Sequence, residues 1–311
     1  MPSYLLTGGA GFIGSHLAGE LSQRGEKVRV IDNFITGKRE NLSSFLDKVE
    51  FIEGDIRDLA LCRRAVEGID FVLHQAALPS VPRSVADPVT SNEINITGTL
   101  NLLLASKDAG VKRFVFASSS SVYGDNPELP KKEGREGSPL SPYALTKIVG
   151  EKYCLIFHRV FGLPTVSLRY FNIFGPRQDP HSQYSAVIPK FINMMLGGHK
   201  PTIFGDGEQS RDFTFVENVV ESNILAAEAQ DAPGEEINIA CGERTAVNFL
   251  AAKINEILGS KIKPTYDKPR PGDIKHSYAD ISKAKKILNY TPFVTFAEGL
   301  EKTINWYRER R

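Results

Sequence analysis

The stretch "TGGAGFIG" at positions 7–14 constrains the fold more than any other part of the chain. It spaces Gly8, Gly11 and Gly14 as GxxGxxG, after the short apolar run "SYLLT" and at the start of a segment with helical apolar spacing. Residues without Cβ allow a turn so tight that a phosphate can reach the backbone N–H groups at a helix N-terminus. The pattern predicts a strand, a phosphate-binding turn and a helix, which together begin a dinucleotide-binding unit.

Strand-like and helical segments then alternate through the first half of the chain. Further strand-like runs lie at 27–32, 49–55, 71–77, 112–119 and 163–172, and helical segments lie near 58–67, 91–109 and 141–161. This alternation is typical of βαβ units. We therefore expect an α/β protein with a doubly wound parallel sheet of the Rossmann type.

The regular alternation ends after residue 172, which predicts a smaller C-terminal α/β region that binds substrate. We expect residues 1–172 to form the dinucleotide-binding domain, rejoined by a helix and a strand within about 212–240. Residues 173–211 and 241–311 would form the substrate-binding region, with helices near 186–198, 246–258, 281–289 and 295–309.

Charge and composition limit the partners. Lys and Arg total 38 against 37 Asp and Glu, so a net charge of +1 gives no electrostatic reason to expect nucleic acid or an anionic membrane. The mixed-charge segment 38–48 predicts a solvated helix. No apolar run approaches the ~20 residues that span a bilayer, and no signal peptide precedes the first strand. Three separated cysteines and six histidines show no metal-ligand spacing, so we expect a soluble cytoplasmic protein without a metal.

Acidic residues at the ends of two predicted strands bear on the cofactor. Asp32 ends the second strand, where a carboxylate accepts hydrogen bonds from adenosine ribose hydroxyls and repels a 2′-phosphate. NAD is therefore expected rather than NADP, although Asp32 and Asn33 also fit a simple turn. Asp55 and Ile56 would flank the adenine, while Asp55 fits a turn equally well. Small residues in "HQAA" (74–77) would let the cofactor lie close.

A tyrosine and a lysine stand four residues apart in "SPYALTK" (141–147). On a helix Tyr143 and Lys147 share one face. A neighbouring ammonium and a cationic nicotinamide favour the phenolate, and moving a tyrosine pKa by ~3 units needs ~4 kcal/mol. The pair is therefore a candidate catalytic base, although the same spacing also occurs on solvated helix faces.

Together these motifs resemble the extended short-chain dehydrogenases/reductases, and within them the nucleotide-sugar 4-epimerases. The resemblance covers nearly the whole chain through "TGGAGFIGSHL", "NITGT", "ASSSSVYGD", "SPYALTK", "LRYFNIFGPRQDP" and "RDFTFVENV". It implies a tightly bound, recycled NAD, a UDP-sugar substrate and a homodimer formed through the helices near 91–109 and 141–161. It also implies that Tyr143 removes the C4 hydroxyl proton, after which a 4-keto sugar turns in the pocket and is reduced from its other face.

The resemblance explains four consecutive serines, Ser118 to Ser121, at the end of a core strand. It identifies Ser119 as the catalytic hydroxyl that orients the C4 hydroxyl toward Tyr143. Related 4,6-dehydratases carry two acids at the positions of Ser120 and Ser121, and decarboxylating relatives keep an acid in this stretch. A serine hydroxyl cannot replace a general acid there. The serines therefore favour chemistry that stops at oxidation and re-reduction of C4, with Ser118 structural and Ser120 close to the sugar.

Further roles carry over by resemblance. The cofactor would contact Gly8, Gly11, Phe12, Ile13, Gly14, Asp32, Asn33, Gly37, Asp55, Ile56, Gln75, Ala76, Ala77, Asn95, Tyr143, Lys147 and Tyr170. The substrate would contact Ser80, Ser119, Ser120, Asn172, Val187, Phe204, Arg211, Arg270, Asp273 and Ser277. Guanidinium groups suit the diphosphate, and a carboxylate suits a ribose diol. Surface ion pairs for the arginines and a turn for Asp273 are the alternatives.

Ser277 bears on the choice of sugar. Relatives restricted to simple hexoses carry a tyrosine at the aligned position, and a small residue there leaves room for a 2-acetamido group. The expected substrates are UDP-GlcNAc and UDP-GalNAc, with UDP-glucose and UDP-galactose also accepted. A uronic acid bound by Arg83 is an alternative, unless Arg83 is simply a surface residue. Another nucleotide-sugar dehydratase, decarboxylase or dehydrogenase, or a silent NAD-binding protein, would be a different class on the same scaffold.

Overall fold

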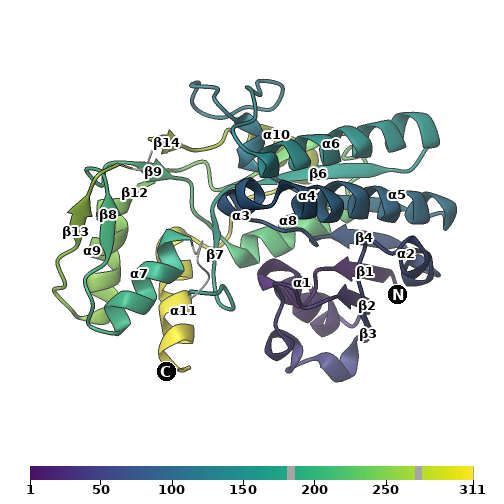
Figure 1. Cartoon of the computed structure of the whole chain (residues 1–311). Helices are drawn as coiled ribbons and strands as arrows, with labels where there is room; N and C mark the ends of the chain where they lie inside the picture. Colours follow the sequence, from purple (N-terminus) through teal and green to yellow (C-terminus); the bar gives the residue numbers. More distant parts are fainter. Residues whose placement is uncertain (181–185, 270–274, 311) are drawn as a thin grey trace.

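A seven-stranded parallel β-sheet forms the centre of the computed structural model, which describes residues 1–180, 186–269 and 275–310 (Figure 1). Its strand order is β11–β6–β5–β4–β1–β2–β3. The strands are β1 Ser3–Thr7, β2 Lys27–Asp32, β3 Glu50–Glu53, β4 Phe71–His74, β5 Arg113–Ser119, β6 Thr165–Tyr170 and β11 Glu236–Ile239. The predicted Rossmann-type sheet is confirmed, and the order reverses between β1 and β4, where such sheets bind ligands beyond the carboxyl ends of the strands.

Helices cover both faces of this sheet. On one face lie α1 Phe12–Gln23, α8 Val216–Glu228 and α10 Ser282–Leu288; on the other lie α2 Leu59–Val66, α5 Gly98–Asp108 and α6 Pro142–Phe161. The strands read as nearly continuous apolar runs because both of their faces are buried. None of the described helices is long and apolar enough to span a membrane.

A smaller α/β region stands beside the sheet (Figure 1). It contains α7 Val187–Leu196, α9 Val247–Leu258 and α11 Phe296–Arg308, packed on a core rich in phenylalanine. Its short strands pair as β7 Ile173–Phe174 with β10 Thr214–Phe215, β8 Thr202–Phe204 with β13 Thr265–Asp267, and β9 Ser210–Arg211 with both β12 Thr245–Ala246 and β14 His276–Ser277. Within the segment that the sequence placed in this region, Ala284 and Leu288 of α10 instead join the core of the large sheet.

The predicted helical segment near 91–109 is confirmed, although it is not α-helical throughout: α4 Pro88–Asn92 continues into a π-helical turn, η3 Glu93–Thr97, and then into α5. One predicted helix differs in the structure. The segment 38–48 is not a solvated helix. It forms two 3₁₀ turns, η1 Arg39–Leu42 and η2 Leu46–Lys48, because Leu42 and Phe45 are buried against α1.

Candidate active site

The glycine turn between β1 and α1 is packed as closely as a backbone allows. A Cβ on Gly8, whose φ is +69°, would lie 2.8 Å from the backbone of Ala76, and one on Gly14 would lie 2.2 Å from the Gly8 carbonyl oxygen. No side chain caps the N-terminus of α1 at Gly11. A glycine-rich turn in front of an uncapped helix N-terminus fits the diphosphate of a dinucleotide.

The Asp32 carboxylate is held beside this turn. Its Oδ2 accepts from the Ala10 backbone N–H at 2.9 Å and its Oδ1 from that of Phe34 at 2.8 Å. Burial raises the pKa of Asp32, whereas these backbone hydrogen bonds lower it. Gly37 is required nearby, because a Cβ there would lie 2.9 Å from Asp32 Oδ1. The carboxylate is thus fixed at the end of β2, where the predicted ribose contact requires it.

Asp55 forms a turn, which was the alternative role that the sequence allowed for this residue. Its Oδ1 accepts from the backbone N–H of Arg57 at 2.8 Å, and its Oδ2 accepts from the side chain of Asn33 at 2.9 Å. Ile56 is buried in the core under α5. Contacts of Asp55 and Ile56 with the adenine, and of Asn33 with the cofactor, stay predictions.

A buried histidine ties the ends of β1 and β4 together. Thr99 Oγ1 donates its proton to the Asn95 carbonyl oxygen at 2.7 Å. His74 Nε2, which lies 2.9 Å from Thr99 Oγ1, must therefore donate to Thr99 Oγ1. His74 Nδ1 then accepts from Thr7 Oγ1 at 2.6 Å. Burial lowers the pKa of His74 to about 3, which keeps the ring neutral. The histidine therefore supports the floor of the cofactor crevice and does not act as a base.

Other predicted cofactor residues belong to buried polar networks. Gln75 Nε2 donates to the Tyr170 hydroxyl at 3.2 Å and to Asn223 Oδ1 at 3.0 Å. Sequence reasoning missed Asn223, because a lone asparagine on α8 carries no local signal. Asn95, in the π-helical turn η3, accepts from the backbone N–H of Leu78 at 2.8 Å and donates to Thr146 Oγ1 at 3.1 Å. Asn95 therefore braces α6 next to Lys147.

The structure brings Ser119, Tyr143 and Lys147 together, as the sequence predicted. Helix α6 starts with Pro142 after an N-cap at Ser141, whose hydroxyl accepts from Ala144 N–H. The Ser119 hydroxyl lies close enough to the Tyr143 phenol to lower its pKa. Lys147 Nζ donates to the Ala117 carbonyl oxygen at 2.6 Å and lies 5.8 Å from the centre of the Tyr143 ring. Their catalytic roles stay predictions that this arrangement permits.

Burial acts on both members of the Tyr143–Lys147 pair. It raises the pKa of Tyr143, and the neighbouring Ser119 hydroxyl partly opposes this rise. It also lowers the pKa of Lys147 to about 8, so the ammonium still predominates at pH 7. Because burial opposes the phenolate, a base at this position depends on nearby positive charge, which Lys147 and a cationic nicotinamide would supply.

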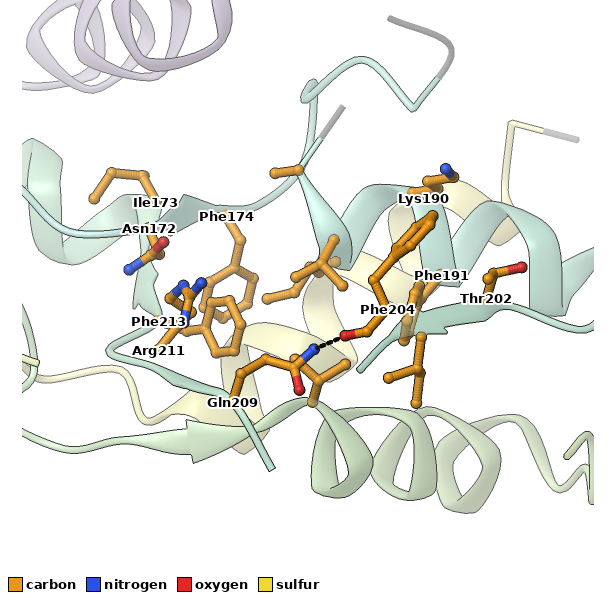
Figure 2. Close-up of a pocket in the computed structure, with 15 residues that line it drawn as sticks. Asn172, Ile173, Phe174, Lys190, Phe191, Thr202, Phe204, Gln209, Arg211 and Phe213 are labelled. Atoms are coloured by element: carbon orange, nitrogen blue, oxygen red, sulfur yellow. Dashed lines mark hydrogen bonds between the residues drawn. The ribbon is translucent and has the colours of Figure 1, made fainter. Parts of the chain in front are cut away.

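A cavity of about 290 Å³ lies in the smaller region (Figure 2). Four predicted substrate residues line it: Asn172, Val187, Phe204 and Arg211. Arg211 and Asn172 lie at one end and Phe204 lies toward the other, with Gln209 between them. Arg211 Nη1 donates to the carbonyl oxygens of Ser210 at 3.0 Å and Lys275 at 3.2 Å. One end of this largely apolar cavity is therefore cationic, which suits a diphosphate with an attached base.

Lys190 and Gln209 also line the cavity, and the sequence did not single them out. Gln209 donates to the Phe204 carbonyl oxygen at 2.7 Å (Figure 2). The sequence signal that could have identified Gln209 as a cavity residue is its place directly before Ser210 and Arg211, because Arg211 was a predicted substrate residue.

The remaining predicted substrate residues occupy separate places. Ser80 caps α3 Val81–Ala86 by accepting from the Arg83 backbone N–H. Ser120 begins the 3₁₀ turn η4 Ser120–Tyr123 after Ser119. Arg270 and Asp273 lie outside the described residues. Within the described ranges, no group of three His, Cys, Asp or Glu side chains could hold a metal ion.

Residues 4–240 match the family described as NAD dependent epimerase/dehydratase family. The chain belongs to this family, which confirms the predicted family and its NAD cofactor. A solved UDP-N-acetylglucosamine 4-epimerase from Methanobrevibacter ruminantium M1, in complex with UDP-N-acetylmuramic acid, is 44% identical with a TM-score of 0.96, covering 100% of this chain and 99% of that one.

Two further solved structures are similar. The UDP-glucose 4-epimerase of Thermotoga maritima with UDP-glucose is 40% identical, with a TM-score of 0.94 and 99% of each chain covered. The UDP-glucuronic acid 4-epimerase of Bacillus cereus, in complex with UDP-glucuronic acid and NAD, is 36% identical, with a TM-score of 0.91, covering 99% of this chain and 100% of that one. These relatives share an architecture and differ in the sugar that they carry.

Proposed function

We propose that this chain, a UDP-sugar 4-epimerase of that family, prefers UDP-GlcNAc and UDP-GalNAc and also converts UDP-glucose and UDP-galactose. The observation that carries the preference is the position of Ser277. It lies in β14 in register with Arg211 of β9, and Arg211 lines the cavity. Paired residues of neighbouring strands present side chains on the same face of a sheet. A small side chain there leaves space for an acetamido group.

The residues around Tyr143 fit proton transfer at the sugar C4 hydroxyl. Ser119 would orient that hydroxyl, Tyr143 would take its proton, and Lys147 would hold positive charge beside the phenolate. When bound, NAD supplies the acceptor and then the donor of the C4 hydride. The same phenol would then return the proton to the C4 oxygen after the sugar has turned. Because the hydride removed from C4 is also the one returned to C4, no external oxidant is consumed. The hydroxyls of Ser120 and Ser121 offer no acid for elimination.

Replacing Ser277 with tyrosine should switch the sugar preference. The added ring would occupy the space for the acetamido group, and overpacking typically costs ~1–3 kcal/mol. We expect the ratio of kcat/KM for UDP-GlcNAc over UDP-glucose to fall ~10- to 100-fold, mostly through the acetylated substrate. Product NMR on a UDP-sugar panel without added NAD measures this ratio, and wild-type turnover in the same panel tests the proposed function itself.

The variant Ser277→Ala is the matched control, because it keeps the position small and should leave the ratio near that of wild type. An equal loss on both substrates in Ser277→Tyr would mean that the ring only damages the site. An unchanged ratio would remove residue 277 from the sugar pocket. Wild-type conversion of UDP-glucuronate alone would favour the uronate alternative over the preference proposed here.

We also propose that two copies of the chain associate through α6. Leu145, Val149, Ile156 and Val160 recur at helical spacing along this helix, and Leu145, Ile156 and Val160 are exposed. Val85 of α3 and Val89 of α4, which pack beside α6, are exposed as well. Such a continuous apolar stripe is typical of an interface between identical helices.

Placing a charge on this stripe should separate the copies. Ile156→Glu would bury a carboxylate in the apolar contact, so we expect light scattering after gel filtration to change from twice the chain mass to the single chain mass. Phe293→Glu, at an exposed apolar residue away from α6, is the control and should stay dimeric. A wild-type protein that is monomeric at micromolar concentration would contradict this proposal.

A further inference from the structure

Three successive turns of α6 meet three successive residues at the end of β5. Three polar groups of the helix face the strand: Tyr143 lies near enough to the Ser119 hydroxyl for that hydroxyl to lower its pKa, Lys147 Nζ donates to the Ala117 carbonyl oxygen at 2.6 Å, and Glu151 Oε1 accepts from the Ser118 hydroxyl at 2.5 Å. The proposed reaction uses the first two contacts. The third belongs to a buried carboxylate with no assigned role.

Glu151 is held by a buried arginine. Both side chains are 2% exposed, and Arg169 of β6 donates through Nε to Oε1 at 2.9 Å and through Nη2 to Oε2 at 2.8 Å. Arg169 also contacts Glu136 and donates to the Tyr123 hydroxyl at 3.2 Å. A carboxylate that accepts from a guanidinium through both oxygens is fixed in place. Glu151 is therefore held one helical turn beyond Lys147 on α6.

We propose that Glu151 is a positioning residue for the catalytic pair. Through Ser118 it fixes the end of β5, so that Ser119 faces Tyr143. Its charge also keeps the Lys147 side chain an ammonium although the site is buried. This role rests on the proposed function and goes beyond it, because Glu151 would act through Lys147 and Ser118 without touching the substrate.

The charged surroundings of Lys147 support this assignment. The titratable groups that act on Lys147 or Glu151 come from four elements and one loop: Tyr143 and Cys154 of α6, His74 of β4, Arg169 of β6, Tyr123 of η4 and Glu136 of the loop before α6. Burial raises the pKa of the Cys154 thiol and lowers that of His74 to about 3, so both are neutral at pH 7. Both Glu136 and Glu151 pair with Arg169, and of the two it is Glu151 that raises the pKa of Lys147.

The variant Glu151→Gln tests the role through the pH dependence of kcat. Without the carboxylate, Lys147 should lose its proton at lower pH, because the negative charge that raises its pKa is gone while burial, which lowers the pKa, remains. The alkaline limb of the pH profile should therefore move down by about one pH unit or more. Val66→Ala, a core truncation in α2, is the control: it should lower stability and leave the limb in place.

Glu151→Asp serves if the glutamine variant does not fold. Its shorter carboxylate would withdraw from Lys147, so the limb should move in the same direction by a smaller amount. A folded, active variant of either kind with a wild-type limb would overturn the proposal. Such a result would leave the proposed function intact, because wild-type epimerisation is measured in the same assay.

The effect of Glu151 on the pKa of Lys147 can also be measured without a substrate, from the pH dependence of protein stability. A buried lysine whose folded-state pKa is lowered makes the protein more stable as pH rises from that pKa toward the unfolded value, because the unfolded chain binds more protons there. For wild type this rise should begin near pH 8, where the pKa of Lys147 lies. In Glu151→Gln it should begin at lower pH, and the difference should vanish in a Lys147→Met background. Identical urea-unfolding profiles for wild type and Glu151→Gln would also overturn the proposal.

Discussion

Tyr143→Phe is expected to abolish nearly all epimerisation, with kcat lower by about 10³-fold or more and the fold and bound NAD retained. The phenyl ring keeps the shape of the side chain and removes the phenol oxygen, whose pKa the neighbouring Ser119 hydroxyl lowers. Ser119→Ala should cost less, about 10²–10³-fold, because it removes one orienting hydroxyl and leaves the base. Product NMR measures turnover, and extraction of the bound nucleotide measures NAD.

Tyr153→Phe is the matched control, because it makes the same change on the same helix at a residue that packs on the core below the site. It should keep wild-type turnover. If Tyr143→Phe retained more than a tenth of wild-type activity, Tyr143 would no longer be the base, and the polar contacts at the end of β5 would need another explanation.

The second large effect is expected for Gly8→Ala, which should deprive the purified protein of most of its NAD. At a φ of +69° an alanine is strained by about 1–2 kcal/mol. Its Cβ would also lie 2.8 Å from the backbone of Ala76, so β4 or the turn must shift. Because the diphosphate depends on this backbone, we expect the NAD content to fall by about tenfold or more and the melting temperature to drop.

Gly259→Ala separates the two causes. Gly259 ends α9 with a φ of +64°, and nothing lies within 4 Å of a Cβ there. This control should lower stability through strain alone and leave the NAD content unchanged. A similar loss of NAD in both variants would show that general destabilisation, rather than the close approach to Ala76, empties the cofactor site.

Patterns with a fixed local geometry were readable from the sequence. The glycine spacing predicted the turn, the change between strand and helix periods predicted the parallel sheet, and the four-residue spacing placed Tyr143 and Lys147 on one helix face. In each case neighbouring residues determine the backbone, so no distant contact is needed to interpret the pattern.

Several assignments required the tertiary structure. The segment 38–48 has the charge pattern of a solvated helix, yet Leu42 and Phe45 are buried against α1. Residues of α10 lie within the segment 241–311 that the sequence assigned to the substrate region, yet Ala284 and Leu288 pack on the large sheet. In both cases packing against an element far away in the chain outweighs the local propensity.

The four serines Ser118 to Ser121 were determined partly by the sequence and partly by the tertiary structure. The sequence alone determined that the end of β5 carries hydroxyls in place of acids, and the family resemblance assigned one of them, Ser119, to the reaction. Only the tertiary structure decided what Ser118 does. Successive residues of a strand point to opposite sides, and the partner of each depends on how α6 and β6 pack against that strand. The Ser118 hydroxyl bonds to Glu151, 33 positions away, and Arg169 reaches the same carboxylate from β6. No local pattern specifies such partners, because they exist only once the sheet and its helices have assembled.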